Sequence, residues 1–303
     1  MKFMEENNVD LQISLDGPKL IHDKYRKFPD GKGTFQIISD NILSMKRYYP
    51  KLYDRLTISS VLVPNDFTIG YIDDFFNNSE ILERLSLDHV MMKAINPDEN
   101  LFYKRYNYPK FLTDFYNRAA ETYKDYLLGR INKESVILPR LLLERNIKKI
   151  YFRSKKRLSD YSHFWPNGIC IPGMRSLFVS CDGAFYPCEK FYDENDLSIG
   201  DIFRGFYFDE IFKLIEDYSS LVSVFCKRCW AYRFCDDCFL SIRNNKVFDL
   251  HRKSQFCQAQ RLSLVFYLIL FTSILEKKYN AFDHLREEGV SVPNYVKLMI
   301  RNE

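Results

Sequence analysis

The sequence predicts an α/β fold built on a parallel sheet, followed by a cysteine-rich region. Two observations predict this arrangement. In residues 9–95, short apolar segments typical of strands alternate with longer segments of helical periodicity. All eight cysteines of the 303-residue chain then lie between positions 170 and 257. The 46% hydrophobic content is enough for a sizeable core in one large domain or two ordinary ones.

The elements expected in the amino-terminal half are strands at residues 9–15, 57–63 and 85–95, and helices at residues 33–47 and 68–84. In the first strand, apolar side chains stand at every second position, and Asp16-Gly17-Pro18 ends it. Strands that alternate with helices at this spacing indicate βαβ units with right-handed crossovers. The sequence therefore predicts part of a doubly wound or barrel fold, since three strands do not close a barrel.

The second half is expected to contain helices, one hairpin and a long final helix. Helices are predicted over residues 108–157 and 207–218, with a hairpin around the Asp182-Gly183 turn between them. A last helix is predicted over residues 254–277. Its apolar run of about 14 residues is too short to span a bilayer, which predicts a buried core helix.

The spacing of the cysteines predicts a metal site. They stand at positions 170, 181, 188, 226, 229, 235, 238 and 257. Cysteines that only pack in a core scatter along a chain, whereas short C-x-x-C steps let neighbouring thiolates bind one centre. Zinc is the rival of iron. Cys229 and Cys235 are closer together than the two C-x-x-C pairs of a zinc ribbon, which favours iron–sulfur clusters.

Charge and the amino terminus restrict the partners and the compartment. The net charge of +4, from 44 basic and 40 acidic residues, is small and includes no block of one sign. We therefore expect neither a nucleic-acid partner nor a membrane partner. Met1 opens a polar segment without the apolar core of a secretory signal. We expect a cytoplasmic, reducing location, where clustered cysteines bind metals more readily than they form disulfides.

The first strand and the loop after it resemble a known family. The segment Ser14-Leu-Asp-Gly-Pro18 is followed by His22-Asp-Lys-Tyr-Arg26 and Gly31-Lys-Gly-Thr-Phe35. This run resembles the fourth strand and following loop of radical S-adenosylmethionine (SAM) enzymes that carry a carboxyl-terminal SPASM domain.

The cysteine pattern is similar to the SPASM domain itself. The departure is that two residues, and not three, separate Cys235 from Cys238. The segments Cys226–Cys235 and Cys170–Gly173 most resemble maturases that install thioether crosslinks in ribosomally made peptides. The anaerobic sulfatase-maturing enzymes share this domain.

The resemblance implies an organisation and a set of metal ligands. Residues 1–160 would be the carboxyl-terminal part of a radical SAM (β/α) barrel, residues 161–258 a SPASM domain with two auxiliary [4Fe-4S] clusters, and residues 259–303 a helical segment. By position, the first cluster would be held by Cys170, Cys188 and Cys238, and the second by Cys226, Cys229, Cys235 and Cys257. The fourth site of the first cluster would be an open iron or Cys181.

The resemblance also implies contacts with SAM at the ends of the strands. Ser14, Asp16, Arg26 and Asn65 are the candidate SAM-binding residues. Each also has an ordinary structural interpretation, such as turn formation at Asp16 or a solvated side chain at Arg26. Glu189 follows a predicted cluster ligand and is the candidate catalytic base, or alternatively forms an ion pair with Lys190.

These inferences predict a radical SAM/SPASM maturase that acts on a peptide or protein. We expect the substrate to contain a cysteine and the maturase to be reduced by ferredoxin or flavodoxin. It would form a thioether or a related oxidised side chain. The C-x-x-x-C-x-x-C motif of the catalytic cluster is absent from the sequence, so we expect the chain to be an incomplete enzyme that is inactive by itself. Two alternatives stay open: a non-catalytic iron–sulfur electron-transfer or peptide-binding module, and a zinc-binding interaction protein.

Overall fold

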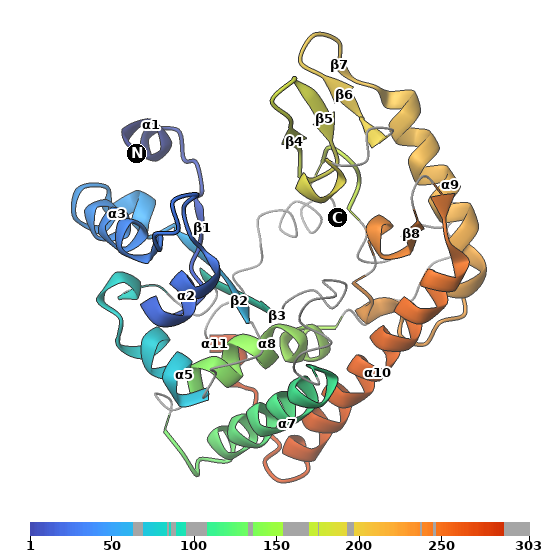
Figure 1. Ribbon diagram of the computed structural model, residues 1–303. Helices are drawn as coiled ribbons and strands as arrows, with labels where there is room; N and C mark the ends of the chain where they lie inside the picture. The colour runs from blue at the N-terminus through green and yellow to red at the C-terminus, as the bar shows by residue number, and fades with distance from the viewer. Residues whose placement is uncertain are drawn as a thin grey trace. The chain divides into compact units, whose positions relative to one another are not determined.

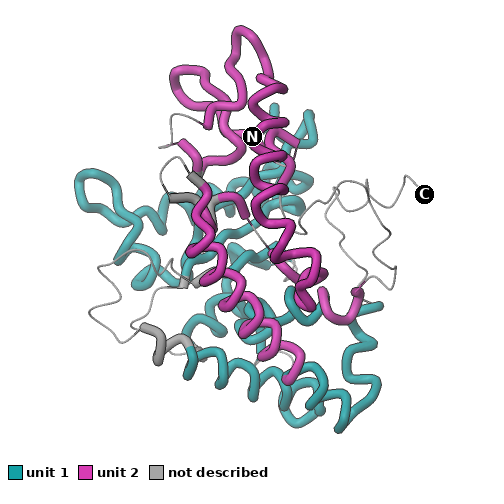
Figure 2. The backbone as a smooth tube through the Cα atoms, turned by 90° about the vertical axis from the view of Figure 1, so that its right-hand side faces the viewer, with its two compact units in different colours: residues 1–148, 270–291 teal, residues 149–269, 292–303 magenta. Residues whose placement is uncertain are grey.

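The computed structural model divides the chain into two compact units, shown in Figure 2. Unit 1 comprises residues 1–148 and 270–291, and unit 2 comprises residues 149–269 and 292–303. The structure describes residues 1–62, 69–83, 85, 89–94, 108–132, 136–153, 170–174, 176–192, 197–236, 238–244 and 247–287. The domain boundary predicted at residue 160 lies outside these residues. The boundary predicted at residue 258 lies within a helix.

Figure 1 labels most of the elements of unit 1. Up to its last long helix they are α1 (Lys2–Glu6), β1 (Gln12–Ser14), α2 (Lys19–Tyr25), α3 (Phe35–Tyr48), α4 (Pro50–Tyr53), β2 (Thr57–Leu62), α5 (Ile69–Asn78), η1 (Glu80–Leu82), β3 (Val90–Ala94), α7 (Tyr108–Leu127) and α8 (Ile137–Tyr151). The unit ends with the last turns of α10 (Leu250–Leu275) and with α11 (His284–Glu287).

Strands β1, β2 and β3 form a parallel sheet in that order. Ile13 pairs with Ile58, and Ile58 pairs with Val90, so these side chains share one face of the sheet. Ile58 and Ser60 on this face are buried, whereas Gln12 and Ser14 on the opposite face are exposed. The predicted parallel sheet is confirmed, and its extension into part of a barrel stays a prediction.

A buried carboxylate from α5 caps helix α8. Asp73 Oδ1 accepts a hydrogen bond of 2.5 Å from the main-chain N–H of Leu138 in the first turn of α8. This acceptor satisfies one of the N–H groups that a helix start leaves unpaired. Burial raises the pKa of Asp73, against the opposing effect of the N–H groups of Leu138 and Ile137.

Unit 2 contains β4 (Phe178–Val179), β5 (Ala184–Tyr186), η4 (Glu189–Phe191), β6 (Gly200–Asp201), β7 (Gly205–Phe206), α9 (Phe208–Cys226), η6 (Tyr232–Phe234), η7 (Phe239–Ile242), β8 (Arg243–Asn244), β9 (Val247–Phe248) and most of α10. Strands β4 to β7 form an antiparallel sheet in sequence order.

The predicted hairpin is confirmed in unit 2. Phe178 pairs with Tyr186 across β4 and β5. The turn contains Gly183, whose φ of +85° is one that L side chains rarely adopt. A Cβ added there would also lie 2.8 Å from Ile202 Cδ1. Only glycine therefore meets both the backbone and the packing requirement at this turn.

Helix α9 is longer than the predicted helix at residues 207–218. It continues to Cys226, and its buried residues Ile211, Leu214, Tyr218 and Val222 are spaced by three or four positions. This face packs in a core with Tyr186, Phe191, Leu197, Phe239 and Ile242. The Ser-Ser-Leu-Val-Ser-Val segment hid the extension, because serine and valine have modest helix propensity.

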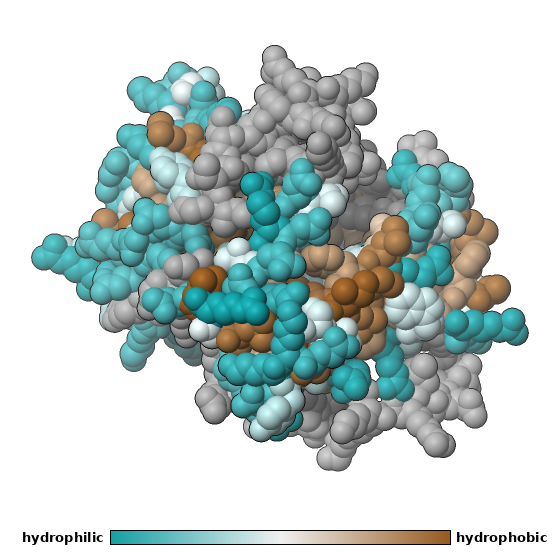
Figure 3. Space-filling model, turned by 90° about the horizontal axis from the view of Figure 1, so that it is seen from below, coloured by the Kyte–Doolittle hydropathy of each residue, from teal (hydrophilic) through white to brown (hydrophobic). Residues whose placement is uncertain are grey.

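Helix α10 confirms the predicted long final helix. Leu264 and Ile274 are buried, but Leu262 is 64% exposed and Ile269 is 63% exposed, so only one face is buried. The helix is long and apolar enough, by those two criteria alone, to cross a membrane, and core helices of soluble proteins meet the same criteria. Figure 3 shows one face of the molecule, on which apolar patches lie between hydrophilic areas.

Candidate functional site

The candidate site lies where strands β1 and β2 end, at the edge that carries ligand chemistry in parallel α/β folds. The main-chain N–H of Leu15 donates to Ser59 O at 2.9 Å, which is the last main-chain bond from β1 to β2. The next N–H of β2 on this side, that of Val61, donates at 3.0 Å to Asp16 Oδ1. A carboxylate therefore takes the place of a main-chain carbonyl and continues the ladder beyond β1.

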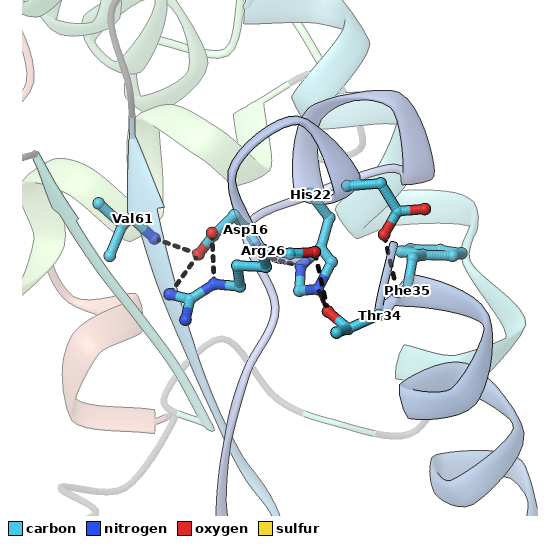
Figure 4. Close-up of polar contacts among 7 residues, drawn as sticks. Asp16, His22, Arg26, Thr34, Phe35 and Val61 are labelled. Carbon is cyan, nitrogen blue, oxygen red and sulfur yellow. Dashed lines mark hydrogen bonds and ion pairs between the residues drawn. The ribbon is translucent and has the colours of Figure 1, made fainter. Parts of the chain in front are cut away.

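The same carboxylate forms a two-point ion pair with Arg26, as Figure 4 shows. Arg26 Nε donates to Asp16 Oδ2 at 2.6 Å, and Arg26 Nη2 donates to Oδ1 at 3.1 Å. The Asp16 side chain is 5% exposed and that of Arg26 is 34% exposed. The pair thus joins a buried anion to a guanidinium whose remaining nitrogen, Nη1, lies outside the pair.

His22 links the two sides of this pair and is completely buried. Its Nδ1 accepts a hydrogen bond of 3.2 Å from the main-chain N–H of Asp16. Its Nε2 lies 2.9 Å from Thr34 Oγ1, and the Thr34 hydroxyl donates at 3.2 Å to the main-chain carbonyl of Arg26. Because the hydroxyl has one proton, Thr34 must accept from Nε2–H, so His22 is the neutral Nε2–H tautomer.

The environment of His22 favours that neutral form. Burial lowers the pKa of His22, and the charge of Arg26 lowers it further, against the opposing effect of Asp16 and Asp23. The Phe35 ring packs edge-on against the imidazole with a centroid distance of 6.0 Å. An uncharged ring can accept from Asp16 and donate to Thr34 at the same time, which a protonated ring cannot do.

Asp23 takes over the capping role that Thr34 leaves vacant. Thr34 is the N-cap residue of α3 but makes no side-chain cap bond. Instead, Asp23 Oδ1 accepts from the main-chain N–H of Phe35 at 2.8 Å. This approach is possible because residue 33 is glycine: a Cβ there would lie 2.0 Å from Asp23 Cγ.

We expect Gly33→Ala to lower the free energy of unfolding by about 2 kcal/mol, because the added methyl group displaces the Asp23 cap of α3. Urea unfolding of the variant measures the loss. The control is Asp23→Ala alone and combined with Gly33→Ala. If the effect acts through Asp23, the two losses are not additive and the double variant resembles Asp23→Ala. Additive losses would contradict this explanation.

The geometry suits recognition of an anion. Asp16 neutralises and orients the guanidinium of Arg26, and the partly exposed side chain keeps donors for a planar carboxylate or a phosphate. Ser14 is exposed on the sheet face at the end of β1. Of the four predicted SAM-binding residues, the structure brings Asp16 and Arg26 into contact, and Asn65 lies outside the described residues. Their contact with SAM stays a prediction.

All eight cysteines lie in unit 2, and none forms a disulfide. Cys188 and Cys226 pack against the core of that unit. Cys226 ends α9, and the main-chain N–H of Cys229 bonds to the Cys226 carbonyl at 3.1 Å, so this C-x-x-C step is one tight turn. Within the described residues, no group of three or more His, Cys, Asp or Glu side chains could hold one metal ion.

The thiol groups of these cysteines are suitable ligands of iron–sulfur clusters, but their positions among the described residues do not form a cluster site. Their number and thiol chemistry suit such clusters. The convergence of three or four sulfurs that a cluster needs is not found among the cysteines that the structure describes. The assignment of Cys170, Cys188 and Cys238 to one cluster and of the four other ligands to a second stays a prediction.

The two remaining candidates lie near the hairpin of unit 2. Cys181 is exposed, with its Sγ 4.0 Å from the hydroxyl of Tyr192. This contact raises the pKa of Tyr192 above its ordinary value. Glu189 is exposed in η4, which begins directly after Cys188, and the Lys190 side chain lies outside the description. The catalytic role of Glu189 stays a prediction.

The roles of His22, Asp23 and Thr34 were not predicted from the sequence. All three stand in the motif that suggested the family, between Asp16 and Phe35. A signal was present, because the loop that follows the Asp16-Gly17-Pro18 turn contains both a histidine and a threonine, two side chains that form hydrogen bonds when they are buried. Their partners became evident only when the loop closed, since His22 and Thr34 are twelve residues apart.

No family model matches the chain. It is 30% identical over 244 residues to a cysteine-type anaerobic sulfatase-maturating enzyme of Clostridium novyi. The aligned residues are 77% of this chain and 58% of that relative. It is 25% identical over 271 residues to the cysteine-type enzyme of Clostridium perfringens, which covers 86% of this chain and 66% of the relative. The chain thus spans about three fifths to two thirds of the length of these relatives.

Solved structures have a similar fold. A native anSMEcpe with bound AdoMet and Kp18Cys peptide matches with a TM-score of 0.57 and 22% sequence identity, over 91% of this chain and 72% of that chain. A polyhistidine-tagged anSMEcpe with bound AdoMet matches with a TM-score of 0.56, over 93% of this chain and 71% of that chain. The homologues of this chain are therefore the anaerobic sulfatase-maturating enzymes, which are of the radical SAM/SPASM family.

Proposed function

We propose that this chain is the SAM- and peptide-binding part of a maturase that modifies a cysteine or serine side chain of a protein substrate. The observation that carries this proposal is the buried Asp16 beneath the partly exposed Arg26 at the sheet edge. Relatives named as cysteine-type and serine-type sulfatase-maturating enzymes support it. A related fold has been solved with AdoMet and a peptide bound.

In this proposal, Arg26 receives the carboxylate of SAM. Its guanidinium is held in one plane by Asp16, which leaves the donors of Nη1 for a ligand carboxylate. Ser14, on the exposed face of β1, would contact the polar ribose. Glu189 would take a proton from the substrate. The product would be a thioether or a related oxidised side chain.

The cysteines of unit 2 would hold two auxiliary clusters, and ferredoxin or flavodoxin would be the reductant of the maturase. Because the described cysteines do not converge, no reaction step is assigned to a cluster. Iron analysis after anaerobic purification tests this part: about eight irons per chain fit two clusters. One or two zinc ions in a colourless protein would instead support the zinc-binding interaction protein.

A non-catalytic binding module is the second candidate for the chain alone. The observation in its favour is that the eight cysteines include no C-x-x-x-C-x-x-C motif. A module of this kind would bind SAM and peptide without cleaving SAM. It would release no 5′-deoxyadenosine when it is incubated with SAM and dithionite.

Titration calorimetry with SAM tests the proposed site. We expect the wild-type chain to bind SAM and Arg26→Gln to bind it about tenfold more weakly or worse, because a charge-assisted pair is lost. Arg261→Gln, an exposed arginine of α10, is the matched control and should bind as the wild type does. Equal affinities of the wild type and Arg26→Gln would overturn the assignment of Arg26.

A further inference from the structure

We propose that His22 is a positioning residue that holds Arg26 in the orientation needed for a carboxylate ligand. The proposal rests on the proposed function, in which Arg26 binds the carboxylate of SAM. It adds a residue to that site which has no contact with the ligand. Thr34 is the second member of the device, because it carries the effect of His22 to the main chain of Arg26.

One imidazole, that of His22, holds two segments of the chain. Nδ1 accepts from the main-chain N–H of Asp16, just after β1, and Nε2 donates to Thr34, just before α3. The ring is completely buried. A buried polar group with both nitrogens satisfied has a defined orientation, since any rotation would leave an unpaired group in the interior.

These two segments hold Arg26 at both of its ends, the guanidinium and the main chain. Asp16 fixes the guanidinium through Nε and Nη2. Thr34 fixes the main chain: the Arg26 carbonyl accepts the Thr34 hydroxyl at 3.2 Å and the Thr34 N–H at 3.3 Å. His22 is hydrogen-bonded to both Asp16 and Thr34, as Figure 4 shows. The imidazole therefore connects the residue that holds the Arg26 guanidinium to the residue that holds the Arg26 main chain.

A fixed Arg26 side chain favours binding of a ligand. A free arginine side chain has many rotamers, and ordering them on binding weakens affinity. Here the Asp16 carboxylate and the Thr34 hydroxyl order Arg26 beforehand. The ordered guanidinium plane favours a planar carboxylate that can accept two parallel N–H bonds. The affinity of a ligand without a carboxylate depends little on this order.

The device depends on the neutral ring. A proton on Nδ1 would face the Asp16 N–H and break that bond. The charged groups that act on His22 are Asp16 and Asp23, which favour the proton, and Arg26, which opposes it along with burial. The positioning is therefore complete above the ordinary pKa of histidine and is lost at acidic pH, as the folded-state pKa is crossed.

The test compares two ligands on four chains. The ligands are SAM and 5′-methylthioadenosine, which lacks the amino-acid carboxylate. The chains are the wild type, His22→Gln, Thr34→Val and the control Thr122→Val, a partly exposed threonine on α7. Thr34→Val keeps the shape of the side chain and removes only the hydroxyl, so it should fold even if the histidine variant does not.

We expect Thr34→Val and His22→Gln to weaken SAM binding about tenfold, to leave methylthioadenosine within about twofold of the wild type, and Thr122→Val to change neither. Equal losses for the two ligands would overturn the proposal, because they would show a general structural role. Unchanged SAM affinity in Thr34→Val would overturn it as well.

A second readout separates this proposal from the proposed function. In nitrogen-15 NMR spectra, the Nε–H of Arg26 should be protected from exchange in the wild type and exchange faster in Thr34→Val. If the wild type binds no SAM, the SAM assignment fails and the proposal about a ligand fails with it. If the wild type binds SAM but the Nε–H signal is equally protected in both chains, only the positioning role fails.

Discussion

Replacing Glu144 by alanine is expected to lower the free energy of unfolding by about 3–5 kcal/mol, because the buried charge of Arg140 loses both carboxylate acceptors. Both residues lie on α8, where Arg140 Nε donates to Glu144 Oε1 at 2.5 Å and Nη2 donates to Oε2 at 3.3 Å. Their side chains are 3% and 6% exposed. Urea unfolding monitored by circular dichroism measures the loss.

The neighbours of the pair explain why the loss should be large. The Arg140 guanidinium lies 5.8 Å from the ring centroid of Tyr126 on α7, and His284 Nε2 of α11 lies 4.0 Å from Glu144 Oε1. The pair thus joins three helices of unit 1. Because the surrounding side chains shield the guanidinium from solvent, hydration does not compensate for the loss of its carboxylate.

The chain offers a matched control for this experiment. Lys2 and Glu6 form another ion pair at the same i, i+4 spacing, but with side chains 78% and 60% exposed. Glu6→Ala should cost less than about 1 kcal/mol. The double variant Arg140→Met with Glu144→Leu should recover most of the stability, since it removes both charges. A Glu144→Ala loss as small as that of Glu6→Ala would refute the argument.

The pair also gives stability a pH dependence. Burial alone would raise the pKa of Glu144, but His284 and Arg140 more than offset it, so the pKa lies below its ordinary value. A depressed pKa means that the contribution is complete above the ordinary pKa of glutamic acid and is lost as the pH falls through the lower folded-state value. Glu144→Gln should therefore lose less stability on acidification than the wild type does.

Replacing Asp16 by alanine is expected to lower the free energy of unfolding by about 2–4 kcal/mol. The variant removes the acceptor of the Val61 N–H and both acceptors of the Arg26 guanidinium. The Asp16 side chain is 5% exposed, so water cannot fully replace these bonds. Urea unfolding gives the magnitude, and amide exchange at Val61 reports the loss at the sheet edge.

Asp30 provides the control for Asp16. It also accepts one main-chain N–H, that of Lys32 at 3.0 Å, and it also pairs with a cation, but its side chain is 53% exposed. Asp30→Ala should change stability far less than Asp16→Ala does, because solvent screens an exposed pair. Asp16→Asn should keep the Val61 bond and weaken the Arg26 pair. If Val61 exchanges as slowly in Asp16→Ala as in the wild type, the carboxylate does not extend the ladder.

The elements of the fold could be predicted where the hydrophobic pattern repeats. Strand β2 at residues 57–62 and the parallel order follow from alternating side chains and from helices between the strands. The carboxyl-terminal half of α9 was missed, because its serines and valines weaken a propensity that burial of Tyr218 and Val222 overrides. Packing against distant segments of the chain stabilises the last turns of α9, and local helix propensity does not predict that packing.

The candidate site, too, could be predicted only in part from the sequence. The motif identified Asp16 and Arg26 as two of four candidate SAM contacts and did not predict that they pair with each other. The structure shows the Asp16 carboxylate occupied by Arg26 and Val61. No role for His22 was predicted, because its partners lie six and twelve residues away. Hydrogen bonds across a loop depend on the path of the loop, and side-chain periodicity does not encode that path.

The carboxylate that extends β1 has a consequence for how the sheet edge can vary. Elsewhere in the sheet, main-chain groups make the bonds between strands, so nearly any side chain is compatible with them. At the Val61 N–H, the bond belongs to one side chain. A descendant of this protein could exchange Ser14 for another residue without disturbing the strands. An exchange at Asp16 would remove a bond of the sheet itself.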